Sequence, residues 1–188
     1  MKKSDLYSKI TTLFTSGARS EAELLLNNSQ TALNAAELLE CFGNLHFYNK
    51  EYQKAIPFFE RAMQTSQEYD CARYHYLLGV NAEKTGRLTD AFKRYQAAIE
   101  IESNFVDPYV ELGGLLFKIE DFEGTLQCYT DAIAIDPNDL PIRHNLIQVL
   151  LQLSLKDSAM YSQLLYDAQA AYNAAKRSLD PPDSNRVW

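Results

Sequence analysis

The sequence has little glycine and proline, with seven and six residues respectively in a chain of 188. An all-β protein needs many tight turns, and these two residues form most of them. Their scarcity therefore argues against an all-β fold. The rest of the composition, 46% hydrophobic and 23% charged, excludes a disordered or collagen-like chain. At this length we expect one compact unit or a short repeat array rather than two independent domains.

Basic residues and long apolar runs are also lacking. Lysine and arginine number 18 against 25 acidic residues, a net charge of −7, whereas nucleic acids and anionic lipids bind to basic surfaces. No stretch approaches the roughly 18 apolar residues of a membrane-spanning helix. The first residues, Met1 to Lys9, lack the apolar run of a secretion signal. We therefore expect no nucleic-acid partner, no membrane insertion and a cytoplasmic location.

Residues that carry catalysis or bind metals are few and scattered. The three cysteines have no C-x-x-C spacing, and we expect them to be small buried hydrophobic residues: Cys41, Cys71 and Cys128. The three histidines have no ligand partner nearby, and His46 and His75 fall on packed faces. No G-x-S-x-G, phosphate-loop or H-E-x-x-H motif is present. The sequence thus predicts no enzyme, no catalytic residue, no metal site and no cofactor.

What the sequence does contain is a repeated pattern anchored on a glycine. Gly79 follows a leucine and precedes small and aromatic residues at fixed distances, namely Ala91, Tyr95 and Ala98. The pattern recurs around Gly113 with Thr125, Tyr129 and Ala132, and around Gly43 with Ala55, Phe59 and Ala62. Within each copy the apolar residues share one face of a helix. Small residues on facing helices predict close packing, with an aromatic ring filling the gap.

These copies resemble the tetratricopeptide repeat (TPR), whose pattern is W-x2-L-G-x2-Y followed by A-x3-F and proline. The spacing of about 34 residues fits, although no tryptophan opens any copy and Thr125 replaces one alanine. The resemblance implies an all-α helical solenoid, a right-handed superhelix of antiparallel helix pairs. It further implies three full repeats with modified helical flanks.

Six segments follow from this interpretation. Residues 1–35 form an N-terminal helical cap, and residues 36–139 hold three repeats (36–71, 72–105 and 106–139). Residues 140–179 form a modified C-terminal hairpin, where Ala168, Tyr172 and Ala175 recreate the second-helix face, and residues 180–188 form a flexible tail. The cap carries more leucine and isoleucine than one short hairpin can bury, which suggests a homodimer through this cap.

The first helices of stacked pairs line a concave surface, where solenoids bind partners. Helical angles place a separate stripe of residues there: Asn44, Phe47, Arg73, Tyr76, Val80, Val110, Gly114, Phe117, His144, Gln148 and Leu151. An apolar strip with a polar rim is typical of a partner site. Tyr76 and Phe117 are the expected anchors. The alternatives are that the tail or the C-terminal hairpin covers the strip, or that the protein dimerises there.

The resemblance also offers one test of ligand class. TPR domains that hold the acidic tail of heat-shock chaperones are similar in a carboxylate clamp of lysine, arginine and asparagine. Here only Asn44 matches, and the other clamp positions hold Glu40, Leu77, Asp107 and Glu111. Acidic side chains would repel a carboxylate, so an apolar peptide anchor is favoured.

The leading hypothesis is a non-catalytic, adaptor-like interaction module that binds an extended or helical segment of another protein. One alternative is a chaperone similar to those that shield translocator subunits in bacterial type III secretion. The other is a self-assembling structural scaffold that joins through its repeat ends.

Overall fold

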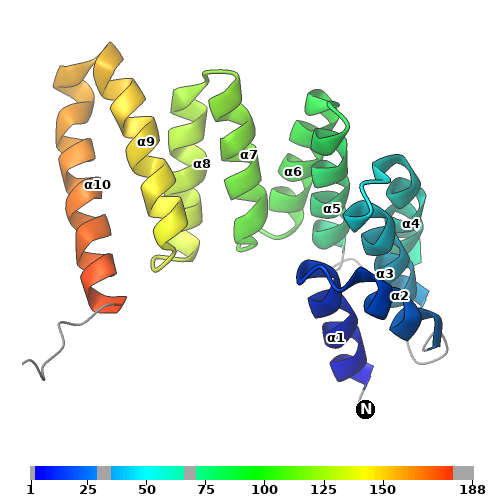
Figure 1. The fold of residues 1–188 in the computed structure, drawn as a ribbon. Helices are drawn as coiled ribbons and strands as arrows, with labels where there is room; N and C mark the ends of the chain where they lie inside the picture. The colour runs from blue at the N-terminus through cyan, green and yellow to red at the C-terminus, as the bar shows by residue number, and fades with distance from the viewer. Residues whose placement is uncertain (1–2, 29–34, 66–70, 180–188) are drawn as a thin grey trace, which may run out of the picture. The chain divides into compact units, whose positions relative to one another are not determined.

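The computed structural model describes residues 3–28, 35–65 and 71–179, and these ranges are built of α-helices (Figure 1). The helices are α1 (Lys3–Thr15), α2 (Arg19–Asn28), α3 (Ala35–Tyr48), α4 (Tyr52–Thr65), α5 (Cys71–Lys84), α6 (Leu88–Ile101), α7 (Val106–Lys118), α8 (Phe122–Ile135), α9 (Leu140–Lys156) and α10 (Ser158–Leu179). The predicted all-α fold class is confirmed. The tail predicted at residues 180–188 lies outside the described residues. Among the helices described, none has the length and apolarity needed to cross a membrane.

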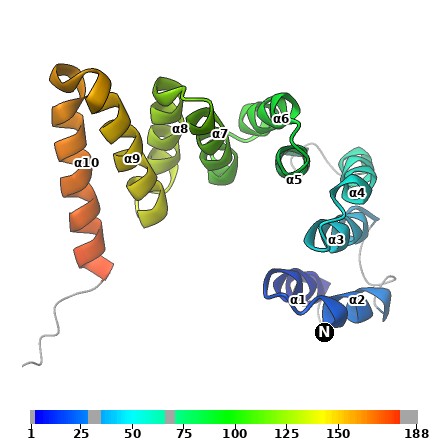
Figure 2. The ribbon, with the colours of Figure 1, turned by 45° about the horizontal axis from the view of Figure 1, so that its top comes forward.

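The chain divides into two compact units, residues 1–103 and 104–188. In the first unit α3 packs against α4 and α5 against α6, with α1 and α2 preceding them. In the second unit α7, α8, α9 and α10 lie side by side in chain order (Figures 1 and 2). Each pair is an antiparallel hairpin of two helices. The segment limits expected from the repeat stay a prediction.

An aromatic ring from the second helix of each repeat lies directly on a glycine of the first helix. A β-carbon would lie 2.5 Å from the ring of Phe59 at Gly43 and 2.6 Å from the ring of Tyr95 at Gly79. At Gly113 it would lie 2.7 Å from the ring of Tyr129. Carbon atoms do not approach so closely, so only glycine lets the two helices pack at this spacing. The predicted packing of small residues against an aromatic ring is confirmed.

The turn between the helices of each repeat has one residue in the left-handed region. Lys50, Gly86 and Glu120 occupy this position, with φ of 63°, 76° and 62°. Each turn closes with two backbone hydrogen bonds, as at Glu120 N–H to Phe117 O (3.1 Å) and Asp121 N–H to Leu116 O (3.0 Å). This is the Schellman motif that commonly ends a helix. Gly86 adopts the conformation without strain, whereas the two side-chain-bearing residues do not.

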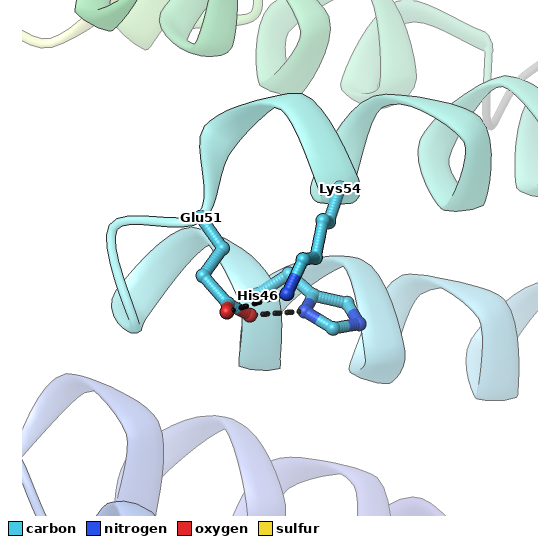
Figure 3. Close-up of polar contacts among 3 residues, drawn as sticks. All are labelled: His46, Glu51 and Lys54. Atoms are coloured by element: carbon cyan, nitrogen blue, oxygen red, sulfur yellow. Dashed lines mark hydrogen bonds and ion pairs between the residues drawn. The ribbon is translucent and has the colours of Figure 1, made fainter.

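His46 is a structural residue of the turn between α3 and α4 (Figure 3). Its Nδ1 atom lies 2.7 Å from Glu51 Oε2, and Lys54 Nζ donates to Glu51 Oε1 at 2.7 Å. These hydrogen bonds, first from Lys54 and then from His46, lower the pKa of the Glu51 carboxyl. The imidazole also stacks on Phe58, with ring centroids 5.2 Å apart. The prediction that His46 serves packing is confirmed.

Most of the apolar residues of the N-terminal segment are buried within the chain, although Leu24 is 63% exposed. Leu6, Ile10 and Leu26 are 4%, 0% and 0% exposed, and they form one core with Cys41 and Leu45 of α3. A homodimer was expected here because one hairpin alone could not bury these side chains. Since α3 supplies the missing surface, that reason for a dimer is removed.

Gly113 and Gly114 provide a matched pair of substitutions for testing the glycine contact. Gly113→Ala places a β-carbon against the Tyr129 ring, which we expect to lower the free energy of unfolding by at least about 1 kcal/mol. At Gly114 the β-carbon would lie 3.9 Å from Tyr129 Oη, an ordinary contact. Gly114→Ala should therefore raise stability by up to about 1 kcal/mol through helix propensity. Urea denaturation followed by circular dichroism measures both; equal effects would contradict the packing.

Glu120→Gly should stabilise the protein by about 0.5–1 kcal/mol, because glycine adopts the left-handed conformation without the penalty of a side chain. Gly86→Ala is the reverse control. Nothing lies within 4 Å of a β-carbon there, so its expected loss of about 1 kcal/mol is purely conformational. Thermal melts of the two variants should shift in opposite directions, and a destabilised Glu120→Gly would contradict this interpretation.

Candidate functional site

The predicted stripe of first-helix residues is partly buried in the first unit. Asn44 is only 7% exposed, and Phe47 packs against the cluster around Phe59 and Leu78. Tyr76 and Val80 are half-buried, and the Tyr76 ring centroid lies 6.3 Å from that of Tyr95. Asn44 and Phe47 were expected to face a ligand, but they contribute mainly to packing. Helical angles predict the direction in which these two side chains point, but they do not predict which neighbouring residues cover them.

Arg73, the one cation expected in the stripe, is held by a buried carboxylate. Its Nε and Nη2 atoms donate to Glu40 Oε1 at 2.9 and 2.7 Å, which connects α5 to α3. Glu40 is 3% exposed, whereas 48% of the Arg73 side chain remains accessible. The guanidinium charge is therefore neutralised within the chain, and this part of the stripe offers little attraction to an anion.

In the second unit the stripe runs from half-buried to exposed residues. Val110, Gly114 and Phe117 of α7 are half-buried, and Phe117 makes an edge-on contact with Phe122 at 5.3 Å between ring centroids. The stripe residues of α9 are exposed, namely His144, Gln148 and Leu151. The apolar part of this stripe continues one turn further to Leu155, which is 81% exposed.

A cavity of about 280 Å³ lies in this second unit, among α7, α8 and α9. Phe117, Tyr129, Asn145 and Gln148 line it. The sequence placed Phe117 and Gln148 on a ligand-binding face, and the structure brings these two together. It adds Tyr129, which was expected to serve packing alone, and Asn145, which was not considered.

The hydroxyl groups of the two core tyrosines have different surroundings. Tyr95 Oη donates to Glu83 Oε2 at 3.0 Å. In the next repeat Phe117 occupies the position of Glu83, four residues after the anchor glycine, and cannot accept a hydrogen bond. Within the parts of the chain that the structure describes, the Tyr129 hydroxyl makes no hydrogen bond, although Tyr129 is only 5% exposed. Burial raises the pKa of Tyr129, so this hydroxyl is neutral.

A comparison of two positions in each repeat could have identified Tyr129 as a candidate binding residue. These are the aromatic residue of the second helix and the residue four positions after the anchor glycine. The first repeat combines Phe47 with Phe59, which needs no acceptor, and the second combines Glu83 with Tyr95. Only the third copy joins a tyrosine to a residue without an acceptor. Alignment of the three copies by their anchor glycines is sufficient to reveal this mismatch.

A second cavity, of about 290 Å³, lies in the first unit among α4, α5 and α6. Its lining mixes apolar and charged residues of both signs: Ile56, Glu60, Leu78, Ala82, Arg87, Asp90, Lys93 and Arg94. Arg87 pairs with Asp90 at 3.6 Å, and Arg94 Nη1 lies 3.5 Å from His75 Nδ1. Burial and then Arg94 lower the pKa of His75. The opposed charges leave this cavity without a clear preference for one ligand charge.

The charged side chains that meet in this first-unit cavity do not form a metal site. No cluster of histidine, cysteine, aspartate or glutamate suited to a metal occurs among the residues described. Burial is the main cause that raises the pKa of Cys41 to about 12 and that of Cys128 to about 11. These two cysteines are buried hydrophobic residues, as predicted, whereas Cys71 is half-buried.

The repeated glycine contact and the paired helices agree with a comparison to known families. A family model described as the tetratricopeptide repeat matches residues 34–102. These residues are tetratricopeptide repeats. The prediction of this protein family, and of its fold of paired helices, is confirmed.

Curated relatives of this chain are distant and longer. Superkiller complex protein 3 of Mus musculus is 26% identical over 85% of this chain, which corresponds to 11% of that protein. The Hsp70-Hsp90 organising protein of Plasmodium falciparum is 24% identical over 69% of this chain and 50% of its own length. The chain thus spans half or less of these relatives.

Solved TPR structures show the same fold at low identity. MamA RS-1, as its ArsTM double mutant, aligns with a TM-score of 0.68 and 18% identity, covering 95% of this chain and 97% of that one. The first TPR of Spaghetti (RPAP3), bound to the HSP90 peptide SRMEEVD, aligns with a TM-score of 0.58 and 18% identity. That alignment covers 64% of this chain and 94% of the Spaghetti chain.

Removal of the two tyrosine hydroxyls should affect the stability of the TPR fold differently. Tyr95→Phe breaks the hydrogen bond to Glu83 and should lower the free energy of unfolding by about 1–2 kcal/mol. Tyr129→Phe removes a hydroxyl without a partner and should leave stability unchanged or slightly higher. Both variants keep the ring that packs on the glycine. Urea denaturation checks the difference, and a larger loss for Tyr129→Phe would show that its hydroxyl is bonded.

Proposed function

We propose that this chain is a non-catalytic protein-interaction module that binds an extended segment of a partner on the faces of its first helices. The observation that carries the proposal is the cavity among α7, α8 and α9, where Phe117 and Gln148 of the predicted stripe meet. Pockets that join an apolar wall to a few polar groups are typical of binding sites. The TPR fold supports a protein partner, since the Spaghetti repeat of the same fold holds a peptide.

The charges argue against an acidic peptide such as SRMEEVD as the ligand. Glu40, Asp107 and Glu111 occupy positions where a carboxylate clamp needs cations. Arg73, which could have compensated, already binds Glu40. A carboxylate entering this face would lose its hydration without gaining an ionic partner, which is unfavourable. An uncharged, partly apolar segment is the better ligand.

The two alternatives from the sequence gain no specific support. A scaffold that joins through its ends needs an apolar stacking face on α10. At the positions that correspond to Leu126 and Ile133 of α8, α10 carries the exposed polar residues Gln169 and Lys176. Its exposed apolar residues, Met160, Leu164 and Tyr166, lie nearer the start of the helix. A secretion-type chaperone was suggested by the acidic charge, the three repeats, the N-terminal cap and the apolar groove, and the family it resembles dimerises through its N-terminal helices. Here α3 buries most of the apolar residues of that cap. A cytoplasmic location and the lack of a nucleic-acid partner stay predictions.

The variants that test the proposal must spare the core. Tyr76 and Phe117 looked suitable for truncation, but their rings contact Tyr95 and Phe122. Arg94 is a poor control because it lies beside His75. Gln148→Glu and Gln169→Glu make the same chemical change at two exposed positions of the second unit, of which only Gln148 lines the cavity.

We expect the full chain to select peptides from a phage-displayed library of random 12-residue sequences. Gln148→Glu should weaken binding of a selected synthetic peptide at least about tenfold, equivalent to 1.4 kcal/mol, because it places a charge in the cavity. Gln169→Glu should change it less than about twofold. Fluorescence polarisation measures both affinities. Failure to select any peptide, or equal effects of the two variants, would overturn the proposed function.

A further inference from the structure

The cavity of the second unit contains three uncharged polar side chains without partners of their own. The Tyr129 hydroxyl and the carboxamides of Asn145 and Gln148 form no hydrogen bonds among the residues that the structure describes. Tyr129 is 95% buried, so water can satisfy its hydroxyl only from the cavity side. Because the Tyr129 hydroxyl opens to the cavity, water or a ligand group that enters the cavity can bond to it.

The lining favours a neutral ligand group. It contains no lysine, arginine, aspartate or glutamate, so a charged group would lose its hydration without an ionic partner. Burial, followed by Cys128 and Glu111, raises the pKa of the Tyr129 hydroxyl. That hydroxyl can therefore both donate and accept a hydrogen bond at neutral pH. A carboxylate is the least favoured ligand.

The polar groups also match a specific neutral chemistry. Each carboxamide offers an acceptor oxygen and two donor hydrogens, and the peptide group offers one acceptor and one donor. Asn145 and Gln148 are three residues apart on α9 and share one face of that helix. The Phe117 ring, fixed against Phe122, forms an apolar wall beside them. The volume of about 280 Å³ equals roughly nine water molecules at 30 Å³ each, enough for part of a peptide.

We infer that this cavity binds an uncharged main-chain amide of the partner together with an adjoining apolar side chain, with Tyr129, Asn145 and Gln148 as the hydrogen-bonding groups. The inference rests on the proposed function and names the ligand chemistry of that site. The absence of cations from the lining disfavours a carboxylate, and the Tyr129 hydroxyl contributes one of the hydrogen bonds to the amide. The second repeat lacks such a site, since the Tyr95 hydroxyl already donates a hydrogen bond to Glu83.

Three small probes with one side chain separate charge from hydrogen bonding. N-acetyl-leucine N-methylamide has the complete amide, its methyl ester analogue lacks the N–H donor, and N-acetyl-leucinate has a carboxylate. Titration of the ¹⁵N-labelled full chain by NMR should show the amide shifting the side-chain signals of Asn145 and Gln148. We expect the ester and the carboxylate to bind at least about fivefold more weakly.

Two variants with the same chemical change complete the test. Tyr129→Phe should weaken binding of the amide probe at least about fivefold, while Tyr95→Phe should leave it within about twofold. Overlay of the spectra shows whether each variant is folded. Equal binding of carboxylate and amide, no effect of Tyr129→Phe, or no binding of the amide at all would overturn the inference. These failures are separate from that of the proposed function, which depends on selected peptides and Gln148→Glu.

Discussion

The contact between one aromatic ring and one glycine fixes how the two helices of each repeat pack and which side chain the end of the ring meets. The ring lies on the helix at Gly79 or Gly113 because a β-carbon there would overlap it. This close approach fixes where the far end of the ring points, which is past the glycine toward the residue four positions later. In the second repeat that residue is Glu83, and the Tyr95 hydroxyl reaches it at 3.0 Å. A packing constraint thus also selects which side chain meets the hydroxyl.

The three repeats share one backbone arrangement but differ in the side chains that surround the aromatic ring. Phe47 and Phe59 give the first repeat an apolar pair, and Glu83 closes the second with a hydrogen bond. The third has a buried tyrosine beside Phe117, with an open cavity where a partner would be. The Tyr129 hydroxyl opens to this cavity and makes no hydrogen bond within the described parts of the chain, whereas the Tyr95 hydroxyl is bonded to Glu83. This difference distinguishes a candidate binding position from a position that serves stability alone.

The sequence predicted the features that depend on local periodicity and failed where distant segments meet. Helix pairs, the glycine contacts and the structural role of His46 follow from spacing within one repeat. The ion pair between Glu40 and Arg73 joins residues 33 apart, and it converts an expected ligand-binding cation into an internal link. The burial of Leu6 depends on α3, whose approach no pattern within residues 3–28 reveals. Helical angles give the direction of a side chain, but the neighbour that covers it is set by tertiary packing.

Charge and burial together restrict what the first-helix faces can bind. In the first unit the accessible guanidinium of Arg73 is neutralised by the Glu40 carboxylate, which is 3% exposed. In the second unit the cavity lining contains neither basic nor acidic residues. A charged ligand group would therefore lose its hydration at both places without compensation. A neutral amide loses less hydration on entry, and Tyr129, Asn145 and Gln148 can replace the hydrogen bonds that it gives up. Discrimination against acidic peptides then arises from the absence of cations, while affinity arises from hydrogen-bonding groups that the folded chain leaves unused.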